Sequence, residues 1–126
     1  MRLLLDSHAF LWWLGDESKL KREAMSAIAD PSSVVNVSAA TIWELSIKSS
    51  LGKLDLGTVD LVAEIDGNDF VELPIAARHS SVAASLPRHH DDPFDRMLIA
   101  QALYEGLTIV TRDPAFSSYG VPILST

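Results

Sequence analysis

Short apolar runs separated by helix-like segments constrain the fold of this chain more than any other feature. Five runs have the length and composition of buried strands: Leu3–Leu5, Val34–Val37, Phe70–Leu73, Thr108–Thr111 and Val121–Leu124. Short apolar strands that alternate with helices are typical of a parallel sheet covered on both faces. The pattern therefore predicts an α/β domain built on a central, mostly parallel sheet of about five short strands.

The segments between these runs have the spacing and the end signals of helices. Helices are expected over His8–Leu14, Lys19–Ala29, Ser38–Leu51, Val59–Ile65, Ala76–Leu86 and Asp95–Tyr104, with Ser38 as an N-cap. Gly52 suits the residue just past one helix end, and Gly106 is expected to stop another. No repeat or linker interrupts the pattern, so residues 1–126 are predicted to form a single domain.

The composition narrows the class of protein. Apolar residues make up 48% of the chain and charged residues 21%, which is a globular balance. Cysteine is absent, so disulfides and thiolate zinc sites are excluded. The first residues lack a cleavable signal pattern, and no segment approaches the roughly 18 apolar residues of a membrane span. A cytoplasmic protein without a membrane partner is expected.

Four acids lie where apolar runs end or inside apolar helices: Asp6, Glu44, Asp95 and Asp113. Asp6 and Asp113 both follow the carboxyl end of an expected strand, which is where ligands bind in parallel sheets. Carboxylates that converge cannot all stay ionised without a cation, so their convergence would imply a hard metal such as Mg²⁺. Such an ion would also offset the formal net charge of −7, which otherwise disfavours nucleic-acid binding.

Each acid also has a purely structural interpretation. Asp6 and Asp113 could cap helices, and Asp92 fits an N-cap that is followed by proline, with Asp95 in the first turn. Glu44 precedes Lys48 by four residues, the spacing of an ion pair, yet it lies at the margin of an apolar stripe. Burying a charged carboxylate there costs free energy unless it is paired or bound to a metal.

The histidines and tryptophans give weaker signals. No histidine pair has the spacing of a zinc site, and His89 and His90 are expected to be solvated. Trp12, Trp13 and Trp43 are expected to be core or interface residues rather than platforms for bases.

Taken together, the motifs resemble the PIN domain, and more closely the VapC-type toxins of bacterial toxin–antitoxin systems. The resemblance rests on four segments in the same order, namely Leu4–Ala9, Ser38–Leu45, Asp92–Ala102 and Val110–Asp113. It implies a three-layer α/β/α sandwich and a divalent-metal-dependent endoribonuclease. The implied reaction is hydrolysis of RNA phosphodiester bonds that leaves a 5′-phosphate and a 3′-hydroxyl.

The resemblance also implies site residues. The family's four acids, which bind the metal and act in catalysis, fall on Asp6, Glu44, Asp95 and Asp113, with Mg²⁺ or Mn²⁺ as one or two ions per site. Ser7, Asp92 and Thr111 are auxiliary candidates. Arg96 and Arg112 adjoin site acids and are candidates for binding the substrate, although either could instead pair with a neighbouring carboxylate. The family often carries a further acid after the last motif, but Pro114–Phe116 follow here, so binding on that side is expected to depend on Asp113.

The implied partners are an RNA substrate, a cognate antitoxin and a second copy of the chain in a homodimer. Two other functions stay open on the sequence. A haloacid-dehalogenase-like phosphatase would use Asp6 as its nucleophile, although His8 stands where that motif expects a second aspartate. A non-catalytic protein-interaction module would use the acids only as helix caps.

Overall fold

The computed structural model describes residues 1–126 and places five strands in one sheet. The strands are β1 (Arg2–Leu5), β2 (Val34–Ser38), β3 (Val71–Leu73), β4 (Thr108–Thr111) and β5 (Ile123–Ser125). Their order across the sheet is β3-β2-β1-β4-β5, and every neighbouring pair is parallel. The predicted sheet of short strands is confirmed, with β1 at its centre.

Six α-helices and two short 3₁₀ helices connect the strands. They are α1 (Ser7–Gly15), η1 (Glu17–Lys19), α2 (Arg22–Ala29), α3 (Ala39–Ser50), α4 (Leu61–Gly67), α5 (Ala77–Ser85), α6 (Pro93–Glu105) and η2 (Pro114–Tyr119). The two 3₁₀ helices were not expected from the sequence. None of the helices combines the length and the apolar character that crossing a lipid bilayer requires.

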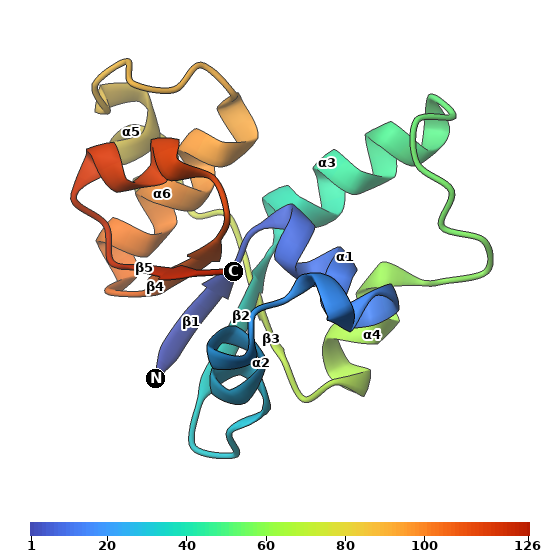
Figure 1. The fold of residues 1–126 in the computed structure, drawn as a ribbon. Coiled ribbons are helices and arrows are strands. Elements are labelled where there is room, and N and C mark those ends of the chain that lie inside the picture. Colours follow the sequence, from blue (N-terminus) through green and yellow to red (C-terminus); the bar gives the residue numbers. More distant parts are fainter.

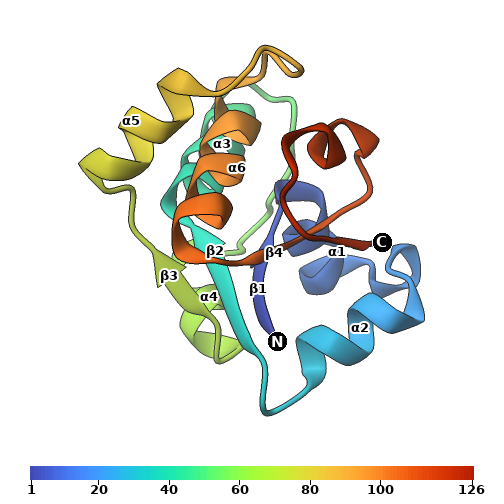
Figure 2. The same ribbon diagram turned by 90° about the vertical axis from the view of Figure 1, so that its left-hand side faces the viewer.

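The sheet separates two apolar cores. Leu3 and Leu5 point to the core beneath α1, α2 and α4, whereas Leu4 between them packs against α6 and η2. Figures 1 and 2 show α5 outside α6, and α3 leaving the end of β2 and extending away from the sheet. The result is the predicted three-layer α/β/α arrangement. The inner strands β1, β2 and β4 are mostly buried, which explains their nearly continuous apolar runs, whereas the edge strands β3 and β5 have no fully buried residue.

Among the predicted boundaries that differ from the structure, two have clear local reasons. The expected strand Val121–Leu124 begins only at Ile123, because Pro122 has no N–H for the ladder and its carbonyl accepts from Ile109 instead. The expected helix Lys19–Ala29 is interrupted, because Leu20 is extended after η1 and is buried in the core. The helix proper begins at Arg22.

Ser38 joins the sheet to two helices. Its hydroxyl oxygen accepts from the backbone N–H of Ala40 at 3.0 Å and caps α3, as predicted, and the hydroxyl donates to Gln101 Oε1 of α6 at 2.6 Å. The Gln101 amide then donates to the carbonyl of Pro74 at 3.2 Å, and both Ser38 and Gln101 are fully buried. This network holds α3 and α6, which carry two of the predicted acids, at a fixed separation.

Replacing Ser38 with alanine is expected to lower the free energy of unfolding by about 1–3 kcal/mol, because it removes a cap and leaves a buried amide short of a partner. Ser50→Ala is the matched control, since Ser50 is exposed and bonds only within its own helix turn. Its effect should stay within about 0.5 kcal/mol. Urea denaturation measures both, and equal midpoints for the two variants would contradict the assignment.

Candidate metal centre

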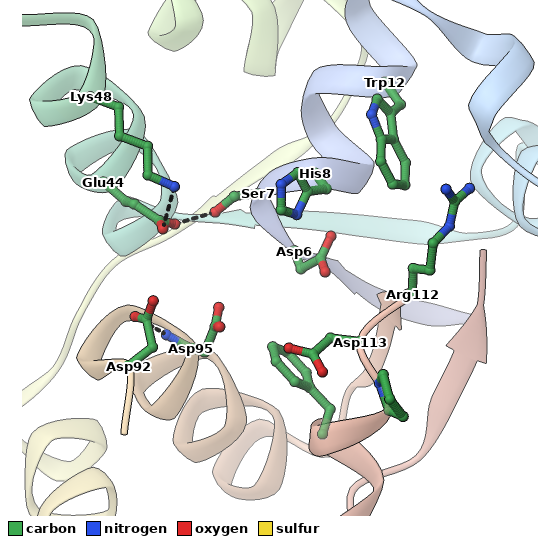
Figure 3. A pocket seen from close by; sticks show the side chains of 12 residues that line it. Asp6, Ser7, His8, Trp12, Glu44, Lys48, Asp92, Asp95, Arg112 and Asp113 are labelled. Carbon is green, nitrogen blue, oxygen red and sulfur yellow. Dashed lines mark hydrogen bonds and ion pairs between the residues drawn. The ribbon is translucent and has the colours of Figure 1, made fainter. Parts of the chain in front are cut away.

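The four predicted acids line one pocket at the carboxyl edge of the sheet. Asp6 follows β1 and Asp113 follows β4, while Glu44 lies on α3 and Asp95 in the first turn of α6. With Asp92 they line a cavity of ≈ 490 Å³. Figure 3 shows these side chains arranged around the same space. Strands β2, β1 and β4 are neighbours, so the topology itself brings their following residues together.

Asp6 is held at the floor of the pocket by the start of α1. Its Oδ1 accepts from the backbone N–H of Ala9 at 2.8 Å, so the predicted capping role is present. Burial raises the pKa of the Asp6 carboxyl, and the negative charge of Asp113 also raises it. Hydrogen bonds from the Thr111 hydroxyl and from Ala9 act in the opposite direction. The net effect is a carboxyl whose pKa lies above its usual range, and a nearby cation would favour its charged form.

Glu44 is the most enclosed acid of the helical part of the site. The Ser7 hydroxyl donates to its Oε1, and Lys48 Nζ lies 3.2 Å from its Oε2. The predicted pair with Lys48 therefore exists, but it is not the exposed surface pair of a typical helix, because the Glu44 side chain is only 9% exposed. Ser7 and Lys48 together fix the direction in which this carboxylate points into the pocket (Figure 3).

Asp95 has a strongly raised pKa. Burial raises its pKa to about 7, the neighbouring charge of Asp92 contributes next, and Glu44 adds to the rise. The imidazole of His90 opposes the shift, with Nε2 lying 2.8 Å from Asp95 Oδ2. A cation among these acids would remove the repulsion between them.

Asp113 and Asp92 combine capping with exposure to the pocket. Asp113 Oδ1 accepts from the N–H of Ala115 at 2.9 Å, and the Asp113 N–H donates to Thr111 Oγ1 at 3.0 Å. Thr111 therefore contacts both Asp6 and Asp113, which fits its predicted auxiliary place. Asp92 Oδ1 accepts from the N–H of Phe94 at 2.8 Å and caps α6, as predicted.

The two candidate arginines differ in position. Arg96 is buried, and its guanidinium donates to the carbonyls of Ala83, Leu86, Pro87 and His90. It does not line the pocket, so we assign it to holding the loop before α6 and not to binding substrate.

Arg112 does line the pocket. Its guanidinium carbon lies 4.3 Å from the centre of the Trp12 ring, and its Nε donates to the Thr126 carbonyl.

The structure adds residues to the site that the sequence reasoning left out. His8 and Trp12 line the pocket and stack on each other, with ring centroids 5.5 Å apart. His90, expected to be solvated, instead lies between Asp95 and Asp113. The available signal was its position five residues before Asp95, in the loop that leads into α6.

The donor set of the pocket fits a divalent metal ion. Five carboxylates line the cavity against two cationic side chains, Lys48 and Arg112. The pKa values of Asp6 and Asp95 are both raised, partly by the other acids. Carboxylate oxygens gathered in this way are the preferred ligands of Mg²⁺ and Mn²⁺. Asp6, Glu44, Asp95 and Asp113 are the residues that could hold such an ion.

The raised pKa of Asp95 predicts that Mn²⁺ binding strengthens with pH. The proton must leave a carboxyl with a pKa of about 7 before that oxygen can bind a cation, so affinity should rise about tenfold from about pH 6 to about pH 8. Calorimetry in buffers of different ionisation enthalpy measures the affinity and the proton released. Asp95→Asn should bind more weakly and lose most of the dependence on pH. An affinity that stays constant over this range would contradict the prediction.

Comparisons with known proteins agree with this geometry. The family model of the PIN domain matches residues 3–122. Ribonuclease VapC22 from Mycobacterium tuberculosis is 28% identical over 125 residues, which cover 95% of this chain and 93% of the relative. Two structures of DNA-bound VapBC complexes are similar to this chain in fold. The match to VapBC2 from Rickettsia felis has a TM-score of 0.74 and 12% identity, and it covers 100% of this chain and 99% of that chain. The match to VapBC from Salmonella typhimurium has a TM-score of 0.70 and 19% identity, and it covers 99% of this chain and 98% of that chain. The resemblance seen in the sequence is confirmed, and the chain belongs to the PIN domain family.

Proposed function

We propose that this chain is a divalent-metal-dependent endoribonuclease of the VapC type, the toxin of a toxin–antitoxin pair. The observation that carries the proposal is the pocket in which Asp6, Glu44, Asp95 and Asp113 come together. A relative named as a ribonuclease over nearly the whole chain supports the same activity. RNA is the proposed substrate, and Mg²⁺ or Mn²⁺, as one or two ions, is the proposed cofactor.

The residues around the acids have separate tasks in this proposal. Ser7 and Lys48 hold the Glu44 carboxylate, and Thr111 holds Asp6 and Asp113 near each other. A bound divalent ion supplies a water molecule of lowered pKa and positive charge for the phosphate. In the overall reaction the water oxygen bonds to phosphorus and the bond to O3′ breaks, which leaves a 5′-phosphate and a 3′-hydroxyl.

Cationic side chains at the rim offer contacts for the RNA backbone. Lys48 and Arg112 both line the pocket, and the exposed Arg112 is held against Trp12. The Arg112 Nε and Nη2 already donate to the carbonyls of Thr126 and Lys19, so Nη1 is the nitrogen left to donate to a phosphate oxygen. These two residues would offset the overall negative charge of the chain locally, where the substrate approaches.

The alternative functions explain less of the pocket. An interaction module with capping acids accounts for Asp6, Asp92 and Asp113, which do cap helices. It gives no reason for the buried Glu44 or for Asp95, whose charges are unfavourable to each other. The phosphatase alternative needs a second aspartate two residues after Asp6, and His8 stands there. Membership of the PIN family does not favour either alternative.

Asp6→Asn and Glu44→Gln are expected to lower RNA cleavage about 100-fold or more, since each removes a charged ligand. Glu23→Gln on the exposed surface of α2 is the matched control and should cleave like the wild type. Purified protein, RNA and Mg²⁺ or Mn²⁺ suffice for the assay, with thermal unfolding to confirm that each variant is folded. Cleavage that is equal in all variants, or independent of the divalent ion, would sink the proposal.

The proposed partners are a cognate antitoxin and a second copy of the chain. The two similar structures are of DNA-bound VapBC complexes, which supports an antitoxin partner. An antitoxin with basic side chains would suit the acidic pocket. Two exposed apolar side chains offer area for a protein interface: Trp43 on α3, at 61% exposure, and Leu51 directly after α3, at 62%.

A homodimer predicts that light scattering on the purified chain gives about twice the mass of the 13.7 kDa protomer. Trp43→Ala tests whether α3 contributes, and it should shift the mass towards the monomer at low concentration. A monomer for the wild type at high micromolar concentration would reject the homodimer and leave the nuclease proposal untouched.

A further inference from the structure

His90 lies between two of the metal-binding acids, on a separate segment from both. Its Nε2 is 2.8 Å from Asp95 Oδ2 on α6 and 3.5 Å from Asp113 Oδ2 after β4. One donor atom from each of the three residues lies within 4.8 Å of the other two. The imidazole therefore faces the two carboxylates on the α6 side of the pocket, where Figure 3 shows Asp95 and Asp113.

This spacing fits a shared ion. An octahedral ion with ligands at about 2.1 Å places adjacent donors about 3.0 Å apart and opposite donors about 4.2 Å apart. The distances from Nε2 to the two carboxylate oxygens fall near the lower of these values. Small side-chain movements would thus place one cation in contact with all three residues.

The backbone around His90 is fixed before any ion binds. The His90 N–H donates to the Tyr119 hydroxyl oxygen at 2.8 Å, and that hydroxyl donates to the Pro87 carbonyl at 2.9 Å. The His90 carbonyl accepts from the buried guanidinium of Arg96. The other ring nitrogen, Nδ1, accepts only a long hydrogen bond of 3.4 Å from the Asp92 N–H. Loss of this weak bond would let Nδ1 carry the ring proton and leave Nε2 unprotonated to bind an ion.

We propose that His90 is a nitrogen ligand of the metal centre and binds the ion together with Asp95 and Asp113. The inference rests on the proposed function, because it assigns a further ligand to the same site. Imidazole nitrogen suits transition metals better than Mg²⁺, whereas carboxylates alone suit Mg²⁺ and Mn²⁺ alike. His90 thus shifts the preference of the centre towards Mn²⁺ and later transition metals.

His89 is a matched control on the same loop. It is exposed, and its ring packs edge-on against Tyr119 at 5.2 Å between centroids, away from the carboxylates. His8 is the other histidine that must be tested, because it lines the pocket and could supply a nitrogen from α1. The three substitutions His90→Gln, His89→Gln and His8→Gln therefore separate the candidate sources of a nitrogen ligand.

Pulsed electron paramagnetic resonance of the Mn²⁺-loaded protein tests the proposal without reference to activity. The wild type should show ¹⁴N coupling to the bound Mn²⁺, and ¹⁵N-histidine labelling should change its frequency. The coupling should vanish in His90→Gln and persist in the other two variants. Calorimetry should show Mn²⁺ affinity lowered about 10- to 100-fold in His90→Gln, with a smaller loss for Mg²⁺.

Other outcomes overturn the assignment in distinguishable ways. Mn²⁺ bound without ¹⁴N coupling would make His90 only a hydrogen-bond donor to the carboxylates and would leave the nuclease proposal standing. Coupling that survives in His90→Gln but is lost in His8→Gln would move the ligand to α1. If His90→Gln does not fold, the labelled wild type shows whether a histidine nitrogen binds the ion. Coupling that persists in His8→Gln and His89→Gln then supports His90, and coupling lost in His8→Gln overturns the assignment. No Mn²⁺ binding at all would reject both this inference and the proposed metal-dependent function.

Discussion

Electrostatic repulsion between the carboxylates of one partly buried pocket is the interaction on which the properties of the site depend. Asp6 and Asp95 have raised pKa values because burial disfavours their charged forms and neighbouring acids add to the cost. His90 opposes the rise at Asp95, and Lys48 pairs with the nearby Glu44. The pocket therefore concentrates repulsion between carboxylates that a bound divalent cation would relieve, which distinguishes it from a solvated acidic surface.

The parallel sheet is what keeps these charges together. The central strand β1 has β2 on one side and β4 on the other, and the residues after all three strands meet at one edge. The buried hydrogen bond between Ser38 and Gln101 joins the start of α3 to α6. It keeps Glu44 on α3 near Asp95 on α6 although their negative charges repel each other. Hydrophobic burial on both sheet faces thus provides the free energy that holds the acids in place.

Sequence reasoning found the acids because strand ends and helix starts are local signals. Asp6 and Asp113 follow apolar runs, and parallel pairing alone brings such positions to one edge. His90 was placed in solvent, since its loop is shaped by the distant contacts of Arg96 and Tyr119 that no local pattern encodes. Arg96 was a candidate for binding substrate because it follows Asp95 in the sequence. Successive side chains on a helix point about 100° apart, and the Arg96 side chain is buried.

Capping and metal binding are not competing explanations for these acids, because a carboxylate has two oxygens. Asp6, Asp92 and Asp113 each use Oδ1 to accept from the first turn of a helix. The cap fixes the rotamer and leaves the second oxygen free of backbone partners, and in Asp113 it is Oδ2 that lies near His90. A helix start after a strand therefore orients a ligand as well as ending the strand. The cap signal in the sequence, which favours a structural interpretation of each acid alone, is part of what positions the acids as a set.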